Sequence, residues 1–139
     1  MRGCYWLLAV LAVSGGCWSA PPAPQRGKIE GKVTVNGKPV SAGKIRFMAI
    51  DPNGMNVAAD IKDGEFSVPA EQGPTKGKYR VEFSVPSATK RRIPDDDNPG
   101  KFIEEAPETL PRRYNFDSTI TADYDPANSQ PLNFPLTTP

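Results

Sequence analysis

The side chains with the most evident chemical potential lie close together in residues 86–117. Asp95-Asp96-Asp97 is followed by a glycine turn, and clustered carboxylates of this kind suit a hard cation such as Ca²⁺. Counted from the first aspartate, however, the fifth position of an EF-hand loop is Pro99 and the twelfth is Ala106, where a carboxylate ligand is required. The template fails. We therefore predict a solvated acidic loop, no metal site and no other cofactor.

Aromatic and guanidinium groups alternate further along the same segment. Arg112-Arg113-Tyr114-Asn115-Phe116 has a composition found on surfaces that bind peptides or sugars. The alternative, which we favour, is structural: Pro111 and Tyr114 lead the chain back onto the domain, and Tyr114 packs at its edge. The residues that remain candidates for ligand contact are Phe102, Arg112, Arg113, Tyr114 and Phe116.

A short basic run, Lys90-Arg91-Arg92, precedes the three aspartates. Such a run can contact lipid headgroups or an acidic polymer. Because Asp95-Asp96-Asp97 follows within three residues, we predict instead that these cations and anions compensate one another.

The sequence offers no recognisable nucleophile with a base, metal cluster or phosphate-binding loop. It contains no histidine, which removes the usual general base of Ser-His and Cys-His catalysis and the commonest zinc ligand. There is no G-x-S-x-G, P-loop or G-x-G-x-x-G motif. Glu104 and Glu105 are adjacent, and adjacent side chains on an extended chain point to opposite faces. We predict that the protein is not an enzyme.

Residues 1–16 differ in composition from the rest of the chain. They carry one cation, a mostly apolar run from Cys4 to Val13, and then small residues. A membrane-spanning helix needs about 20 apolar residues, roughly twice the length of this run. The segment is typical of an export signal peptide that is removed.

The end of this segment, Ser14-Gly15-Gly16-Cys17, resembles the lipobox of bacterial lipoproteins, although Ser14 stands where Leu is usual. The resemblance implies cleavage before Cys17, alkylation of its thiol by diacylglycerol and acylation of its amine. The alternative is ordinary secretion, with Cys17 incidental. Cys4 is the one other cysteine, so no disulfide partner is left after cleavage, and lipidation would remove an unpaired thiol from an oxidising compartment.

Cleavage would remove Arg2 and no acidic residue. The formal net charge of +1 then falls to zero, without the basic excess of a nucleic-acid-binding domain. Residues 17–27 combine the lipidated cysteine with a stretch rich in proline and small residues, an extended tether of about 3 Å per residue. The partners we expect are membrane lipid through Cys17 and an envelope protein or glycan, with no nucleic acid.

Residues 28–137 read as one all-β domain. The 16 prolines and 12 glycines of the chain favour short strands joined by turns, and Asn36-Gly37 and Asp63-Gly64 are hairpin turn signals. Alternation is clearest in 78–85, where Tyr79, Val81 and Phe83 face inward. We predict no helix and seven strands forming a β-sandwich, near 28–35, 44–50, 57–61, 66–68, 78–85, 118–124 and 132–136.

Several motifs resemble those of carboxypeptidase regulatory-like domains. They are IEGKVTVNGKPV at 29–40, KDGEF at 62–66 and GKYRV at 77–81; LPRRYN at 110–115, STIT at 118–121 and NFPL at 133–136 are similar to a subgroup of small bacterial lipoproteins. The resemblance implies a transthyretin-like (prealbumin-like), seven-stranded Greek-key β-sandwich. In that family such domains are accessory or adhesive modules without catalytic residues.

Two functional hypotheses follow. The first is a lipoprotein anchored in the bacterial cell envelope, on its periplasmic or surface face, that displays a non-catalytic module for envelope structure or for contact with protein or glycan. The alternative is an accessory protein that binds a sugar or calcium through the loop at 86–117. The second hypothesis predicts an ordered loop beside a concave surface lined by Phe102, Tyr114 or Phe116.

Overall fold

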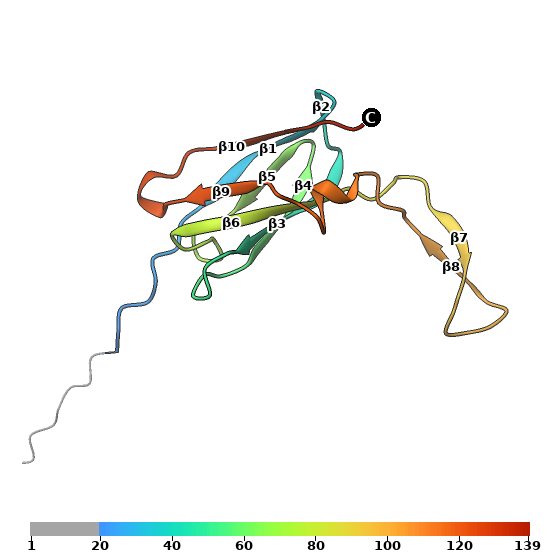
Figure 1. The fold of residues 1–139 in the computed structure, drawn as a ribbon, viewed down its shortest axis with the longest axis horizontal. Helices are drawn as coiled ribbons and strands as arrows, with labels where there is room; N and C mark the ends of the chain where they lie inside the picture. Colours follow the sequence, from blue (N-terminus) through green and yellow to red (C-terminus); the bar gives the residue numbers. More distant parts are fainter. Residues whose placement is uncertain (1–19) are drawn as a thin grey trace, which may run out of the picture.

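The computed structural model describes residues 20–139 (Figure 1). The signal peptide, Cys17 and the first part of the tether lie outside this range. Within it the chain is all-β, with two short 3-10 turns and no helix long and apolar enough to cross a bilayer. The elements are β1 (Ile29–Val35), β2 (Lys38–Pro39), β3 (Ala42–Ala49), β4 (Val57–Lys62), β5 (Glu65–Val68), β6 (Gly77–Ser84), β7 (Arg91–Pro94), β8 (Phe102–Glu105), η1 (Arg112–Tyr114), β9 (Thr121–Tyr124), η2 (Pro126–Asn128) and β10 (Leu132–Leu136).

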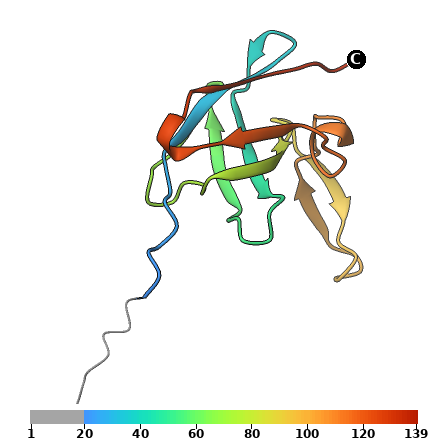
Figure 2. The same cartoon turned by 60° about the vertical axis from the view of Figure 1, so that its left-hand side comes forward.

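Eight of these strands form one curled sheet. Its order is β10-β1-β5-β4-β3-β6-β9, with β2 paired to β1, and every pair is antiparallel except β1 with β10. Phe134 on β10 packs against Phe83 on β6, with ring centroids 5.1 Å apart, although these strands lie near opposite ends of the sheet order. The sheet must therefore bend back on itself, and Figure 2 shows this curl from the side.

The core lies inside the curl, and the predicted alternation is confirmed. Tyr79, Val81 and Phe83 of β6 are almost fully buried, between outward-facing polar neighbours. Aromatic contacts cross the interior, for example between Phe47 and Phe66 with ring centroids 5.8 Å apart. The other buried apolar residues of the core strands include Ile29, Val33, Ile45, Val57, Ile61, Val68, Tyr124 and Leu136.

Two predicted turns set the register of the hairpins. Asn36-Gly37 connects β1 to β2 and Asp63-Gly64 connects β4 to β5, each as a two-residue loop. All four residues have positive φ, between 51° and 79°. Two-residue turns of this hand match the twist of the flanking strands, and Asn, Asp and Gly tolerate positive φ best.

The prediction of seven strands is incomplete. It missed β2, and it treated residues 86–117 as a connection, whereas this segment contains the β7–β8 hairpin. The hairpin escaped detection because β7 and β8 bury little, so the apolar alternation that reveals a core strand is weak there. The last predicted strands are present, although β9 begins at Thr121 rather than Ser118.

The folded body begins before Lys28. Arg26 forms a β-bridge with Thr75, and the Gly27 amide donates to the Pro74 carbonyl at 3.2 Å. Gly27 is buried beneath Tyr124 and Pro126, where a Cβ atom would collide with both side chains. The described part of the tether before Arg26, residues 20–25, is exposed and has no regular structure.

Candidate functional site

The β7–β8 hairpin projects from the body at the end opposite residues 20–25 (Figures 1 and 2). It is a two-stranded sheet separate from the large one. At its base a β-bridge joins Pro86 to Glu108, and the Ser87 amide donates to the Pro107 carbonyl at 2.8 Å. This end of the molecule also carries η1, four residues after Glu108, and is the candidate interaction surface.

Glu108 fixes the hairpin to the body. Its carboxylate accepts the Val85 amide at 2.8 Å, the Ser84 hydroxyl at 2.7 Å, and the amides of Thr109 and Leu110 at 3.1 Å each. One side chain therefore links the end of β6 to the chain that returns from the hairpin. The sequence analysis missed Glu108 because the residues next to it in the chain do not indicate that its carboxylate accepts hydrogen bonds from the end of β6.

The basic run pairs across the hairpin, so the prediction that it compensates the three aspartates is wrong. Arg91 contacts Glu105 at 2.6 Å and Lys90 contacts Glu104 at 3.4 Å. The guanidinium of Arg92 lies 4.6 Å from the centre of the Phe102 ring. The cause is antiparallel register, which brings residues 91 and 92 opposite 105 and 104 and leaves the aspartates at the tip.

The three aspartates lie in the turn at the hairpin tip, and Asp95 stabilises it. Asp95 accepts the Asp97 amide at 3.0 Å and the Asn98 side-chain amide at 2.9 Å. Its own amide donates to the Lys101 carbonyl at 3.0 Å. Within residues 20–139, no three acidic, histidine or cysteine side chains converge as a metal site would require. The Asp95 side chain thus stabilises the local turn.

Large apolar side chains are exposed at this end. Phe102 and Ile103 on β8 are 53% and 48% exposed, and Phe116, after η1, is 79% exposed. Within the described residues, the other exposed large apolar side chains are Ile50 and Met55, in the β3–β4 loop. Exposed aromatic side chains beside arginine are a composition typical of the centres of protein interfaces.

Tyr114 and Arg113 hold the C-terminal segment instead of lining a pocket. The Tyr114 hydroxyl donates to the Thr137 carbonyl at 2.8 Å and accepts the Thr137 amide at 3.0 Å, and Arg113 donates to the same carbonyl at 2.7 Å. The ring packs against the core. Hydrogen bonds from the Thr137 hydroxyl and backbone, with a further one from Arg113, lower the pKa of Tyr114 to about 8.

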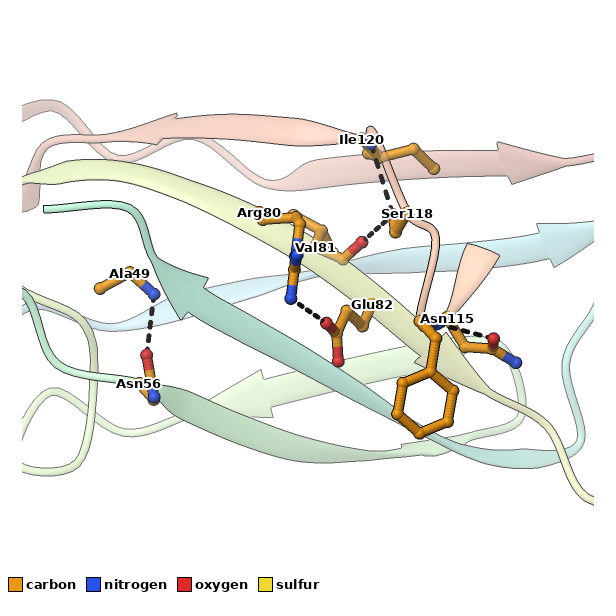
Figure 3. Close-up of polar contacts among 9 residues, drawn as sticks. Ala49, Asn56, Arg80, Val81, Glu82, Asn115, Ser118 and Ile120 are labelled. Carbon is orange, nitrogen blue, oxygen red and sulfur yellow. Dashed lines mark hydrogen bonds and ion pairs between the residues drawn. The ribbon is translucent and has the colours of Figure 1, made fainter. Parts of the chain in front are cut away.

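The segment after η1 is fixed to β6 by a buried serine. Figure 3 shows the Ser118 hydroxyl between Val81, to whose carbonyl it donates, and Ile120, whose amide it accepts at 3.3 Å. Beside it Asn115 accepts the Phe116 amide at 2.7 Å, which holds the exposed ring at the surface. These two bonds of Ser118 hold the segment against β6. Arg112 pairs with Asp117 at 3.2 Å.

The larger surface clefts lie elsewhere. One, of about 660 Å³, runs over β1, β4 and β5 and is lined by both acids and lysines, including Lys32 and Glu65, which are 3.6 Å apart. A second, of about 510 Å³, lies at the tether end, where Lys76 and Asp125 are 2.8 Å apart. This pairing lowers the pKa of Asp125 and raises that of Lys76. The described clefts are not lined by Phe102, Arg112, Arg113, Tyr114 or Phe116.

Comparison of the chain with protein-family models, with curated proteins and with solved structures finds no match.

Proposed function

We propose that this protein is an exported, membrane-anchored lipoprotein that displays a non-catalytic β-domain for contact with another component of the cell envelope. The observation that carries the proposal is the opposite placement of its two ends. The chain enters the body beside Thr75 and η2, and the hairpin with its exposed aromatic ring extends from the other end (Figure 1). A lipid on Cys17 would therefore leave the hairpin pointing away from the point of attachment.

The proposed fold family agrees with the architecture at the coarse level. A curled, mostly antiparallel sheet with a single core supports a β-sandwich, and we propose the Greek-key, transthyretin-like arrangement of carboxypeptidase regulatory-like domains for it. The motifs at 29–40, 62–66 and 77–81 fall on β1 and β2, on the β4–β5 hairpin and on β6. These are the elements on which a shared sandwich would depend.

The anchor is the first part of the proposal to test. Mass spectrometry of the mature protein is expected to find an N-terminal Cys17 that carries diacylglycerol and an acyl chain. Each buried acyl methylene contributes about 0.8 kcal/mol, so the protein should remain in the membrane fraction on washing. Cys17→Ser should remove the lipid and release the chain, whereas Ser19→Ala should change neither. A lipid-free wild-type protein in the soluble fraction would refute the proposal.

The partner at the far end is proposed to be an envelope protein or glycan. Support comes from the exposed Phe102 beside Arg92 and from the exposed Phe116. Pull-down from intact envelopes should retain the partner with the wild-type chain and lose it with Phe102→Ser. Ile50→Ser, at the opposite end, is the matched control. The alternative of a small ligand held by residues 86–117 has less support, because the two larger described clefts lie elsewhere and the one beside Asn115 has a volume of only about 20 Å³.

A further inference from the structure

The outer edge of β8 has no strand partner within residues 20–139. The hairpin is a sheet of two strands, and the larger sheet does not continue into it. An isolated two-stranded sheet is only marginally stable in water, and an unpaired edge is a template for pairing with another chain. The backbone geometry shows which edge of the hairpin offers the better template.

The hydrogen-bonding pattern of the ladder assigns the outward groups. Asp95 lies opposite Lys101 and donates its amide to that residue's carbonyl, so this pair is a hydrogen-bonded one. In an antiparallel ladder such pairs alternate with pairs whose backbone groups point outward. On β8 the outward residues are therefore Phe102 and Glu104, and each presents one N–H and one C=O to a neighbouring strand.

The same alternation makes β7 a poorer edge. Its outward residues are Arg92 and Pro94, which lie opposite Glu104 and Phe102. Proline has no N–H, so β7 offers one outward donor where β8 offers two. Proline on an edge strand is a common means of preventing further pairing.

We propose that β8 pairs antiparallel with β8 of a second copy of this chain, with Ile103 opposite Ile103 of the second copy. This register matches Phe102 with Glu104 of the other copy and forms four backbone hydrogen bonds. It also places Lys101 of each copy opposite Glu105 of the other copy. These two symmetry-related pairs join opposite charges across the strands and are attractive.

Neighbouring registers are worse for reasons visible in the sequence of β8. Centring the pair on Glu104 would set two glutamates directly opposite each other, and like charges in that position are destabilising. Centring the pair on Phe102 would place Gly100 opposite Glu104 of the other copy. Gly100 lies in the tip turn with φ of 88°, so the backbone hydrogen bonds between these two residues would be lost. The register at Ile103 is thus selected by both charge and bonding.

Pairing at β8 also covers apolar surface. Ile93 and Ile103 are opposite each other on the hairpin, hence on the same face. The second copy adds its own two isoleucines, which produces a row of four across a four-stranded sheet. Ile103, now 48% exposed, would lie at the centre of that row.

This inference deepens the proposed display role, because it names a second copy as a partner of the far end. The pairing uses only residues 91–105 and does not require lipid on Cys17. If the chain dimerises but carries no lipid, the pairing of β8 is supported and the lipid anchor is refuted. If the chain is lipidated but monomeric, the anchor is supported and the pairing is refuted.

A crosslinking experiment tests the register. In the full chain with Cys4→Ser and Cys17→Ser, an added cysteine is the only thiol. Opposite residues of a non-hydrogen-bonded pair have Cα atoms about 4.5 Å apart, within the range of a disulfide. Mild oxidation should convert Ile103→Cys into a covalent dimer, whereas Phe102→Cys, which faces Glu104 of the other copy, should stay uncrosslinked. Equal crosslinking of both variants, or of neither, would overturn the proposal.

Charge variants test the same interface without a covalent bond. Lys101→Glu and Glu105→Lys each turn both cross-copy pairs into like-charge pairs, and each alone should weaken self-association about tenfold. An equimolar mixture restores both attractive pairs and should sediment as a heterodimer, an outcome that a misfolded hairpin could not give. A wild-type chain that sediments as a monomer up to its solubility limit would overturn the inference, even if pull-down identifies a different envelope partner.

Discussion

The curled sheet and the β7–β8 hairpin are both antiparallel β-structure, but different forces stabilise them. In the sheet, Phe47, Phe83 and Val81 have no exposed surface, and apolar burial dominates. In the hairpin, Phe102 and Ile103 are about half exposed, and the cross-strand contacts are ion pairs and a cation–π contact. Exposed ion pairs contribute little stability. The sequence of the hairpin can therefore change with little effect on the stability of the fold, and its exposed side chains are accessible to a partner.

The largest expected contrast comes from removing one phenylalanine ring in each region. Phe47→Ala should lower the free energy of unfolding by about 3–5 kcal/mol, because the ring leaves a cavity in a close-packed core. Phe102→Ala should change it by less than about 0.5 kcal/mol, since the ring is already in contact with water. Denaturant titration of both variants measures the difference. Equal losses would show that the hairpin belongs to the same cooperative core.

The junction between the two regions should give an intermediate effect. Glu108→Ala removes an acceptor shared by Ser84, Val85, Thr109 and Leu110, and we expect a loss of about 1–2 kcal/mol. Hydrogen exchange should accelerate at the amides of Val85 and Leu110 but not at Val81, deep in β6. Glu104→Ala, a carboxylate on the hairpin itself, is the control and should leave those amides protected. Unchanged exchange in Glu108→Ala would mean that backbone contacts alone hold the junction.

The smallest effect concerns pH and the C-terminal segment on the body. Because the hydrogen bonds with Thr137 and Arg113 lower the pKa of Tyr114 to about 8, the folded chain ionises this phenol more readily than the unfolded chain does. Its contribution to stability is then lost as pH falls through 8 and is fully present above the unfolded pKa of about 10. Ultraviolet titration should show one tyrosine ionising near pH 8, and Tyr114→Phe should abolish that phase.

A low-pKa phase that survives in Tyr114→Phe would assign it to another tyrosine. Tyr124 is an unsuitable source, because burial raises its pKa. The corresponding slope of stability with pH between 8 and 10 should disappear in the same variant.

Much of the main sheet could be predicted from local sequence. Alternation with a period of two located β1, β3, β4, β5 and β6 and showed which side of β6 faces inward, because burial on one face imposes that period directly on the sequence. Asn36-Gly37 and Asp63-Gly64 marked two hairpin turns for an equally local reason, their tolerance of positive φ.

The candidate surface was less predictable. Residues 86–117 were recognised as the unusual segment, and Phe102 and Phe116 as candidates for ligand contact. The partners of Arg91 and Lys90, however, were assigned to the aspartates that follow them in sequence, not to the glutamates across the hairpin. Pairing partners depend on register, and a strand that buries neither face leaves no periodic trace of its register.

The sequence by itself determined the positions of the main strands, the inward face of β6 and the turns between neighbouring strands, since each of these depends on residues close together in the chain. Only the tertiary structure decided the rest. It placed the hairpin at the end of the molecule opposite the tether. It also brought together residues far apart in the chain, in the parallel pairing of β1 with β10 and in the hydrogen bond from the Val85 amide to Glu108. Such contacts follow from how the whole sheet curls to close its core, which no single segment encodes.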